Sequence, residues 1–413
     1  MKIVKRNYFL KTFLIVFATV GAAFLNFVLQ IMYTKKLSIE DYGRLSLYLN
    51  FIMIMMPLVG AGLHNFWIKI HSKDSNEFVF WLPPSFNYLK LTLFFSFFIQ
   101  AIFCIIYVGK ETHIYALLSS FILAQLSIDL INSLNIISRK IGEYIFWRCF
   151  SPVIRIILFS IVLVFSEITL FKIGLIYLIS AIFPVFFLLK KMRSEKKVFT
   201  KNKYKYSALD VFKNCWAYSV AGVLYLIYLQ SNVLFISYFY TDKEVGIFNI
   251  PILMIMVVLM FPTIIFQKVF AVELNQSFYR NKESFKVFFR KSNRIMLGLG
   301  VLASLLFYFL SPVVIDIFFG ETYSQSKYIA GILALLIPFA FLTSSLSAAH
   351  IKKIDLYTKV GIMLCVAIVH IILSVLLQEY GGMEVFAFIT VISYFLVSIL
   401  FFISSKKIIA RMN

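Results

Sequence analysis

Twelve hydrophobic stretches, each long enough to cross a bilayer, run through almost all of the 413-residue chain. Hydrophobic residues make up 61% of it and charged residues only 14%. A helix of about 20 apolar residues crosses a hydrocarbon core about 30 Å thick and satisfies its own backbone hydrogen bonds there. The sequence therefore predicts an all-α, multi-pass membrane protein. The predicted spans are residues 9–33, 45–63, 88–109, 113–137, 145–166, 170–189, 214–239, 247–267, 295–315, 328–350, 358–378 and 385–405.

Lysine and arginine are distributed unequally between the segments that connect these spans. Segments on the side of the N-terminus carry 32 of the 40 basic residues and segments on the other side carry 7, while Arg155 lies within a span. The positive-inside rule then places both termini in the cytoplasm. The formal charge of +21 is explained by this topology and by attraction to anionic lipids, and it does not indicate a nucleic-acid partner. The basic N-terminus and its long apolar run predict a retained first helix rather than a cleaved signal peptide.

The chain divides into two similar halves. Its most basic loop predicts an N-terminal six-helix lobe (1–190), a cytoplasmic linker (191–213) and a C-terminal six-helix lobe (214–413). The motif Asp41-Tyr42-Gly43 after the first span recurs 203 residues later as Glu244-Val245-Gly246 after the seventh. Because each lobe crosses the membrane an even number of times, we predict a parallel pseudo-repeat.

Polar residues within the fourth and fifth spans are the candidate functional residues. Gln125, Asp129 and Asn132 share one helix face, and Arg148 and Arg155, seven residues apart, share another. Ionisable groups in a membrane usually face a cavity or one another. Counted from the turn between the spans, Asp129 and Arg155 lie at similar depth. We therefore expect them to pair or to share a cavity wall, and a fixed structural ion pair is the alternative.

Three further polar residues lie inside other spans. Asn26 and Gln30 are one turn apart in the first span, where they would either face a cavity or hydrogen-bond to neighbouring helices. His370 in the eleventh span is either a packed histidine or a proton carrier. The four cysteines have no spacing typical of a metal site or of disulfides.

Several motifs resemble the polysaccharide flippases, the O-antigen translocases of the Wzx type, within the superfamily that includes multidrug-and-toxin antiporters. They are EDYGRLSLY (40–48), EVGIFNIPILMIMVVLMFPTIIFQKVF (244–270), FFGETYS (318–324) and VISYFLVS (391–398). The resemblance implies two six-helix lobes around a central cavity. It also implies movement of an undecaprenyl-diphosphate-linked oligosaccharide from the cytoplasmic to the periplasmic leaflet of a bacterial inner membrane.

The polar residues within the spans suggest a hypothesis for how such transport would work. Arginines would bind the diphosphate, and protonation of Asp129 would release an arginine for this purpose, which couples transport to protons; His370 is a second candidate for coupling. No cofactor is expected beyond a coupling proton or sodium ion. The expected partners are membrane lipids, a polysaccharide polymerase and a chain-length regulator of lipopolysaccharide biosynthesis.

Two other classes of function remain open. A multidrug cation antiporter would share the fold, although the intramembrane arginines favour an anionic cargo. A membrane polymerase or acyltransferase is disfavoured because the longest predicted external connector has eleven residues (34–44). The sequence also lacks a phosphate-binding glycine loop, a nucleophile elbow and a metal-ligand cluster. We therefore expect a transporter rather than an enzyme.

Overall fold

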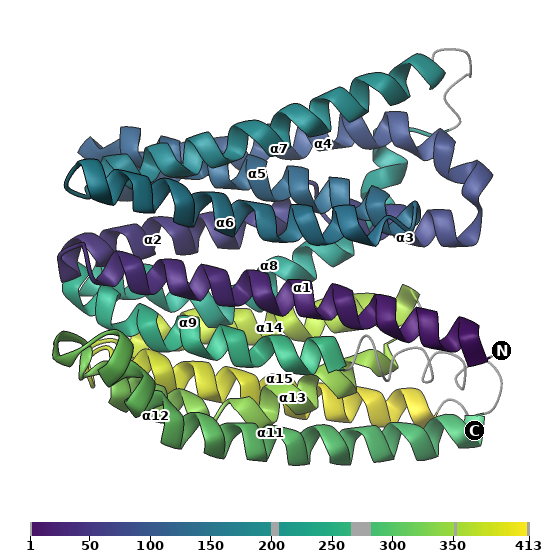
Figure 1. Ribbon diagram of the computed structural model, residues 1–413. Helices are drawn as coiled ribbons and strands as arrows, with labels where there is room; N and C mark the ends of the chain where they lie inside the picture. The colour runs from purple at the N-terminus through teal and green to yellow at the C-terminus, as the bar shows by residue number, and fades with distance from the viewer. Residues whose placement is uncertain (1, 200–205, 266–281, 351–352, 411–413) are drawn as a thin grey trace. The chain divides into compact units, whose positions relative to one another are not determined.

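The computed structural model describes residues 2–199, 206–265, 282–350 and 353–410. Helices make up nearly all of these residues, and no strand occurs among them (Figure 1). The first half forms α1 (Lys2–Thr34), α2 (Ile39–Met55), α3 (Leu63–Lys73), α4 (Ser75–Phe103), α5 (Thr112–Ile137), α6 (Ile141–Phe165) and α7 (Leu170–Phe199). The second half forms α8 (Ala208–Phe239), α9 (Asp242–Ile265), α11 (Lys282–Phe318), α12 (Ser326–Ala334), α13 (Ile337–Leu346), α14 (Lys353–Leu377) and α15 (Glu384–Ala410).

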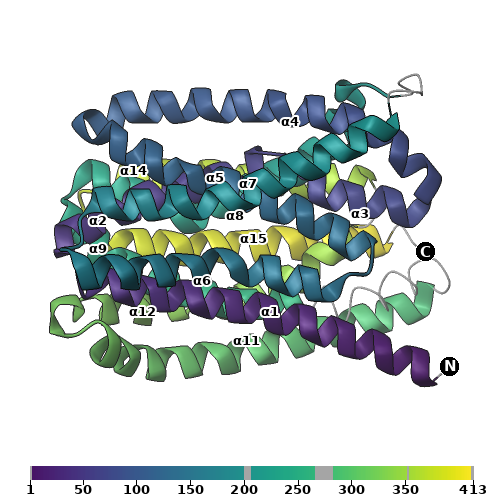
Figure 2. The ribbon, with the colours of Figure 1, turned by 45° about the horizontal axis from the view of Figure 1, so that its top comes forward.

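Eleven helical runs in the described residues are long and apolar enough to cross a membrane. One of them, residues 77–137, has 61 residues and contains both α4 and α5. A π-helical turn and a short 3-10 turn with Gly109 at φ 57° separate these helices, and the chain reverses direction there (Figure 2). Because α4 has 29 residues and α5 has 26, each is long enough to span alone. The predicted all-α, multi-pass architecture is confirmed, with twelve spans when α4 and α5 are counted separately.

The second apolar run, residues 39–73, is interrupted between α2 and α3. Pro57 lies in a 3-10 turn, and Gly60, Ala61 and Gly62 follow with φ values of 70°, 38° and 78°. Left-handed backbone conformations are accessible mainly to glycine, and successive positive φ values cannot continue a right-handed helix. This span is therefore a helix broken near one end rather than a continuous rod.

The helices form two compact units. Unit 1 comprises residues 1–30 and 48–223, and unit 2 comprises residues 31–47 and 224–413. In this division the end of α1 and the start of α2 belong with the C-terminal half of the chain. The first part of α8 belongs to unit 1, where the Ser219 hydroxyl donates a hydrogen bond of 2.6 Å to the Pro57 carbonyl.

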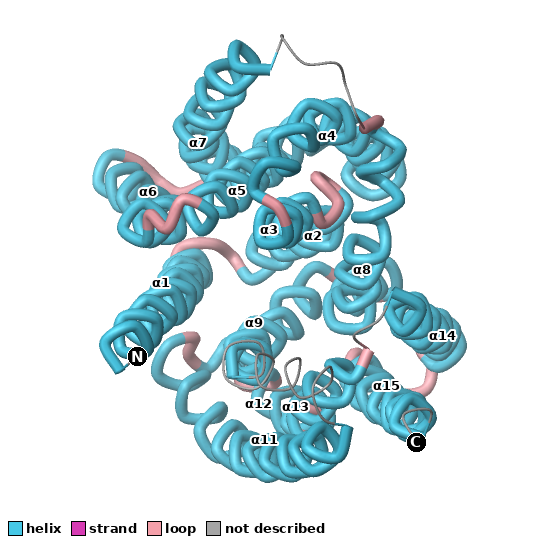
Figure 3. The backbone as a smooth tube through the Cα atoms, turned by 90° about the vertical axis from the view of Figure 1, so that its right-hand side faces the viewer, coloured by secondary structure: helices cyan, strands magenta, loops and turns pink. Residues whose placement is uncertain are grey.

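Each unit is organised around a central helix. In unit 1, α5 packs against α7, α6 and α3, as the end-on view in Figure 3 shows. In unit 2, α13 packs against α11, α15 and α9, and α14 packs against α15. The buried side chains of α5 include Ile122, Ala124 and Leu130 as well as the polar residue Asn132. The polar residues predicted for the fourth span are therefore carried by the central helix of unit 1.

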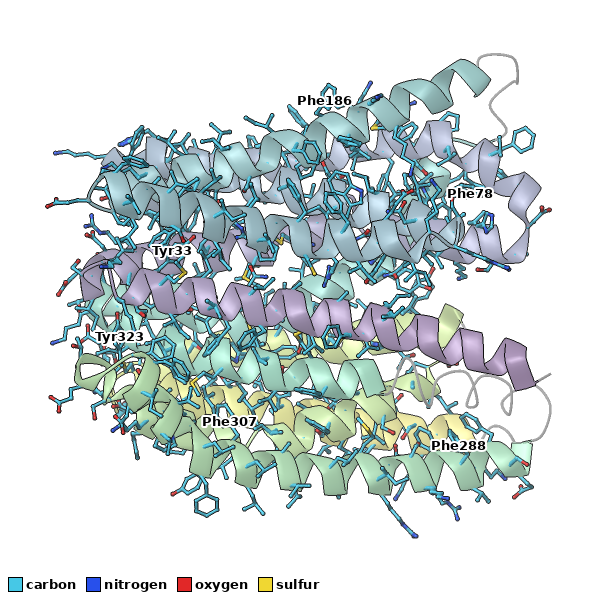
Figure 4. All side chains as sticks on the ribbon, viewed as in Figure 1. Tyr33, Phe78, Phe186, Phe288, Phe307 and Tyr323 are labelled. Atoms are coloured by element: carbon cyan, nitrogen blue, oxygen red, sulfur yellow. The ribbon has the colours of Figure 1, made fainter. Side chains whose placement is uncertain are left out.

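Large apolar side chains cover the outside of the molecule. Phe186 on α7 is 59% exposed and points away from its unit (Figure 4), and Phe165 at the end of α6 is 82% exposed. In water such a surface would be unfavourable, whereas in a bilayer lipid tails solvate it. In contrast, Arg155 is only 2% exposed. This distribution is expected for a membrane protein, in which polar groups are retained inside because they have a role there.

Two glycines on α11 provide a test of helix packing in unit 2. A Cβ atom added at Gly300 would lie 2.8 Å from Cα of Pro338 and 2.9 Å from Cβ of Phe341 on α13, whereas one added at Gly298 would meet nothing within 4 Å. We expect Gly300→Ala to destabilise the protein by about 1–3 kcal/mol through overpacking. The matched variant Gly298→Ala should be neutral or slightly stabilising. Thermal unfolding of the purified protein measures both, and equal melting temperatures would contradict this packing.

Candidate substrate site on α5 and α6

The polar face predicted for α5 is present and internally connected. Gln125 and Asp129 are one helical turn apart, and the Gln125 amide donates a hydrogen bond of 3.0 Å to Asp129 Oδ1. Asn132 lies on the same face, is 4% exposed, and neither of its amide atoms has a hydrogen-bond partner. A buried, unpaired amide is unfavourable by about 1–3 kcal/mol. The face therefore retains unused hydrogen-bonding capacity.

Asp129 forms its ion pair with Arg148. Arg148 Nη1 lies 3.6 Å from Asp129 Oδ1, and the two side chains are 30% and 37% exposed. Of the two alternatives predicted for Asp129 and Arg155, direct pairing is not what this structure contains, and a shared cavity wall stays a prediction. The turn between α5 and α6 is short, so a residue about two turns before the end of α5 faces one about two turns after the start of α6. Partial exposure leaves the Arg148 guanidinium reachable by a ligand.

Arg155 lies two turns further along α6 and is almost completely buried, at 2% exposure. Its Nε donates to the Ser151 carbonyl at 3.1 Å, and its Nη2 donates to Asn26 Oδ1 on α1 at 2.9 Å. The guanidinium carbon lies 4.6 Å from the ring centroid of Phe121 on α5 and 4.7 Å from that of Tyr177 on α7. Both distances suit cation–π interactions.

This environment stabilises the Arg155 charge without a carboxylate. Among the described residues no acidic side chain lies within 4.0 Å of Arg155. Amide and aromatic groups from α1, α5 and α7 surround it instead. The aromatic partners were not predicted, because 47 phenylalanines and 23 tyrosines occur throughout the spans and none is marked out by the sequence.

The remaining candidate residues lie elsewhere or make fewer contacts. Asn26 joins the site through Arg155, and its own amide nitrogen donates to the Ala22 carbonyl at 2.8 Å. Gln30, one turn further along α1, is half-buried and makes no side-chain hydrogen bond within the described part of the chain. His370 lies in unit 2 and belongs to a different polar cluster.

His370 is fully buried and bonded at both ring nitrogens. Nδ1 lies 2.9 Å from Ser393 Oγ on α15, and Nε2 lies 3.0 Å from Asn232 Oδ1 on α8. The Asn232 amide in turn donates to Thr390 Oγ1 at 2.5 Å and to the Phe386 carbonyl at 3.3 Å. This network links α8, α14 and α15. Its partners could not be predicted because they are 23 and 138 residues away in the sequence.

The described residues contain no group of three or more His, Cys, Asp or Glu side chains arranged to hold a metal ion. What the site on α5 and α6 offers is two guanidinium groups at different depths, one carboxylate and several amides. Guanidinium groups bind phosphates through paired hydrogen bonds, and amides bind hydroxyl groups. The arrangement is suited to an anionic, hydroxyl-rich ligand.

Solved structures with the same fold include those of a flippase and of multidrug transporters. The lipid II flippase MurJ in its inward closed conformation matches with a TM-score of 0.69 and 17% identity, over 95% of this chain and 87% of MurJ. An outward-facing multidrug resistance MATE family transporter of the MOP superfamily matches with a TM-score of 0.66 and 12% identity, over 97% of this chain and 96% of the transporter. The inward-facing conformation of a multidrug resistance MATE family transporter matches with a TM-score of 0.64 and 14% identity, over 95% of this chain and 94% of the transporter.

At these identities the matches show a shared fold. No curated protein matches the sequence. A sequence profile of the family described as "Polysaccharide biosynthesis protein" matches residues 9–272, well over half of the chain. This multi-pass membrane protein, which has the fold of MOP-superfamily transporters, therefore belongs to the family of polysaccharide biosynthesis proteins.

Proposed function

We propose that this protein is a flippase that moves undecaprenyl-diphosphate-linked oligosaccharides, such as O-antigen repeat units, from the cytoplasmic to the periplasmic leaflet by alternating access. The observation that carries the proposal is the partly exposed Arg148, held by Asp129 on the polar face of α5. A flippase for such a substrate must provide cations for the diphosphate and hydrogen-bonding groups for the sugars. The lipid tail can remain in the bilayer throughout.

Two cations at different depths suit a diphosphate that moves across the membrane. Arg148 and Arg155 are seven residues apart on α6, which corresponds to about 10 Å along the helix. Arg148 is accessible and is the first contact, whereas Arg155 is enclosed in this conformation and would bind after rearrangement. The amides of Gln125, Asn132, Asn26 and Gln30 are the proposed ligands for sugar hydroxyl groups.

Asp129 is the proposed coupling residue. While it is charged it holds Arg148, and its protonation would weaken the ion pair and leave the guanidinium free for phosphate. Proton binding and substrate binding at Arg148 would then be linked. Residence in the bacterial inner membrane with both termini in the cytoplasm, and assembly with a polymerase and a chain-length regulator, belong to the same proposal.

A charge-swap experiment tests the site. In a strain that lacks the gene but builds the lipid-linked repeat unit, Arg148→Gln should lower surface polysaccharide display at least about tenfold. That loss equals about 1.4 kcal/mol, within the range of one charge-assisted hydrogen bond. The double variant Asp129→Arg/Arg148→Asp keeps the ion pair, so it should accumulate to the wild-type protein level. It should not restore surface polysaccharide display, because the arginine now lies on α5 rather than on α6. Full display by the swapped protein would show that the ion pair is only structural.

The control pair lies close by on the same helix hairpin. Lys140 and Glu143 form an ion pair of 2.7 Å whose side chains are 58% and 49% exposed. Such surface pairs contribute little to stability, so neutralising both residues should leave display unchanged. A loss of display in this control would mean that charge anywhere near the turn matters, and the assignment to Arg148 would fail.

A further inference from the structure

The helix α11 is much longer than the hydrocarbon core of a membrane is thick. It runs from Lys282 to Phe318, which is 37 residues and about 55 Å. Its charged residues are confined to the two ends, and none occurs between Arg294 and Asp316. The rise from Arg294 to Asp316 is about 33 Å, close to the thickness of about 30 Å of a hydrocarbon core. These two residues therefore place the two boundaries of the bilayer along α11.

The start of α11 is fixed in rotation by the face that it buries in unit 2. Phe285, Phe289, Ser292 and Met296 follow one another at helical spacing, and each is at most 2% exposed. The rings of Phe285 and Phe289 stack with centroids 5.8 Å apart, and Ser292 Oγ lies 3.4 Å from Ser345 Oγ on α13. Figure 3 shows α11 beside α13 at the edge of unit 2. The opposite face of these turns is therefore held towards the outside of the unit.

Three basic residues occupy that outward face. Arg290, Lys291 and Arg294 are all exposed and lie within little more than one helical turn. Among the described residues, no carboxylate lies within 4.0 Å of any of them. The acid in the preceding turns, Glu283, is paired instead with Lys286, whose Nζ lies 2.7 Å from Glu283 Oε1. Three positive charges are thus gathered on one face without an ion-pair partner in the described part of the chain.

Directly beyond Arg294 the exposed surface of α11 becomes apolar. Val301 and Leu305 are about half exposed, and Phe309 further along is also exposed. In a bilayer, lipid tails cover a surface of this kind. The three cations therefore lie at the end of an apolar strip at the boundary of the bilayer. This arrangement of charge and apolar length matches the headgroup and the acyl chains of an anionic phospholipid.

We propose that Arg290, Lys291 and Arg294 form a binding site for the phosphate headgroup of an anionic phospholipid, whose acyl chains lie along the exposed side chains of α11. Arginine binds phosphate oxygens through paired hydrogen bonds. Each basic residue near an anionic membrane surface strengthens binding about fivefold. A zwitterionic phospholipid gains less, because its own ammonium group balances the phosphate charge. The site requires only that the protein is embedded in a membrane, so it does not depend on the proposed transport function.

A lipid-linked oligosaccharide also carries phosphate on a lipid, but this surface does not suit its movement across the membrane. Between Arg294 and Asp316 no exposed side chain of α11 carries a charge or an amide. A headgroup bound at Arg294 would therefore have no polar path to the other leaflet along this face. The far end presents a carboxylate instead, since Asp316 Oδ1 lies 2.5 Å from Lys327 Nζ. A resident phospholipid needs neither a path nor a second site.

Photo-cross-linking of the full-length protein in liposomes tests the site. The photoreactive residue p-benzoylphenylalanine replaces either Val301, two turns beyond Arg294, or Phe309, which lies nearer to Asp316. The liposomes contain equal amounts of phosphatidylglycerol and phosphatidylcholine, and each lipid is traced in turn by a tail-labelled analogue. The ratio of phosphatidylglycerol to phosphatidylcholine cross-linked at position 301 should exceed the ratio at position 309 at least about fivefold. Equal ratios would show that only ordinary bilayer lipid surrounds α11, and the proposal would be overturned.

A pair of charge variants assigns the preference to these cations. Arg290→Gln/Arg294→Gln should lower the ratio at position 301 at least about fivefold. The matched control Lys406→Gln/Lys407→Gln removes the same number of charges from exposed residues at the end of α15 and should leave the ratio unchanged. Equal effects of the two variants would show that total charge attracts the lipid. That result, or a preference that persists in Arg290→Gln/Arg294→Gln, would overturn the site.

A third tracer separates a phospholipid site from a substrate site. Undecaprenyl-diphosphate-linked oligosaccharide, present in the same amount as phosphatidylglycerol, should be cross-linked at position 301 no more than phosphatidylglycerol is. Preferential cross-linking of the oligosaccharide lipid would identify a substrate docking surface and overturn the proposal. Melting temperatures measured in the same liposomes check that each variant is folded. The comparison of positions 301 and 309 with all native charges in place decides the proposal even where a charge variant does not fold.

Discussion

Replacing Arg155 with methionine is expected to lower flipping at least about tenfold while shifting the melting temperature by only a few degrees. Two opposing effects act on stability. The variant loses two cation–π interactions, each worth up to about 2 kcal/mol when desolvated, and leaves Asn26 Oδ1 without its donor. It also removes a buried charge that has no carboxylate partner among the described residues, and that burial is unfavourable by several kcal/mol.

Because these effects nearly cancel, folding alone gives little reason to keep an arginine at this position. The proposed binding of the diphosphate would account for an arginine there. Arg155→Lys keeps the charge but loses the planar group that lies between Phe121 and Tyr177, so we expect an intermediate loss of flipping. Melting temperature and flipping are measured on the same preparation. Severe destabilisation of Arg155→Met with normal flipping per folded molecule would show that Arg155 only joins the helices.

Replacing His370 with leucine is expected to destabilise the protein by about 2 kcal/mol or more. The change leaves Asn232 Oδ1 without its imidazole partner in the core of unit 2, whereas Ser393 keeps its hydrogen bond of 2.8 Å to the Ile389 carbonyl. A buried polar group left unpaired is unfavourable by about 1–3 kcal/mol. Ser374→Ala is the matched control on α14, because the buried Ser374 hydroxyl has no hydrogen-bond partner in the described structure. Thermal unfolding should show a large loss for the first variant and none for the second.

The same position also tests the prediction that His370 carries protons. Glutamine can replace the imidazole as a hydrogen-bonding group but does not titrate. If His370 only connects α8, α14 and α15, His370→Gln should keep both its stability and the pH profile of transport. A stable His370→Gln protein whose transport no longer depends on pH would instead identify this histidine as a coupling site.

The sequence was sufficient to predict the spans but not the pairing of side chains between them. Apolar length and helical periodicity are local properties, so the twelve spans and the shared face of Gln125, Asp129 and Asn132 could be inferred directly. The partner of Asp129 depends on where α5 ends and α6 begins, and the predicted boundaries differed by several residues. The predicted fourth span ends at residue 137, as α5 does, but the predicted fifth span begins at residue 145, four residues after the start of α6 at Ile141. This shift of about one helical turn moved the expected partner from Arg148 towards Arg155.

The repeat illustrates a long-range feature that the sequence does contain. The offset of 203 residues between Gly43 and Gly246 was visible without a structure, although their contact was not. Sequence symmetry showed that the two positions are equivalent, whereas only the packing of α2 on α9 showed that they meet. By contrast, nothing local distinguishes Phe121, Tyr177 or Asn232 from the many similar residues in the spans.

This protein is proposed to move a lipid-linked oligosaccharide rather than a cationic drug. The most direct measurement uses purified protein in liposomes that contain undecaprenyl-diphosphate-linked oligosaccharide, with and without a pH gradient. A membrane-impermeant glycosidase reports the fraction of sugar that reaches the outer leaflet. We predict that wild-type protein exposes sugar from both leaflets and that Arg148→Gln leaves the inner-leaflet share protected. Unchanged protection with wild-type protein, together with gradient-driven uptake of a cationic dye, would overturn the proposed function and identify a multidrug antiporter.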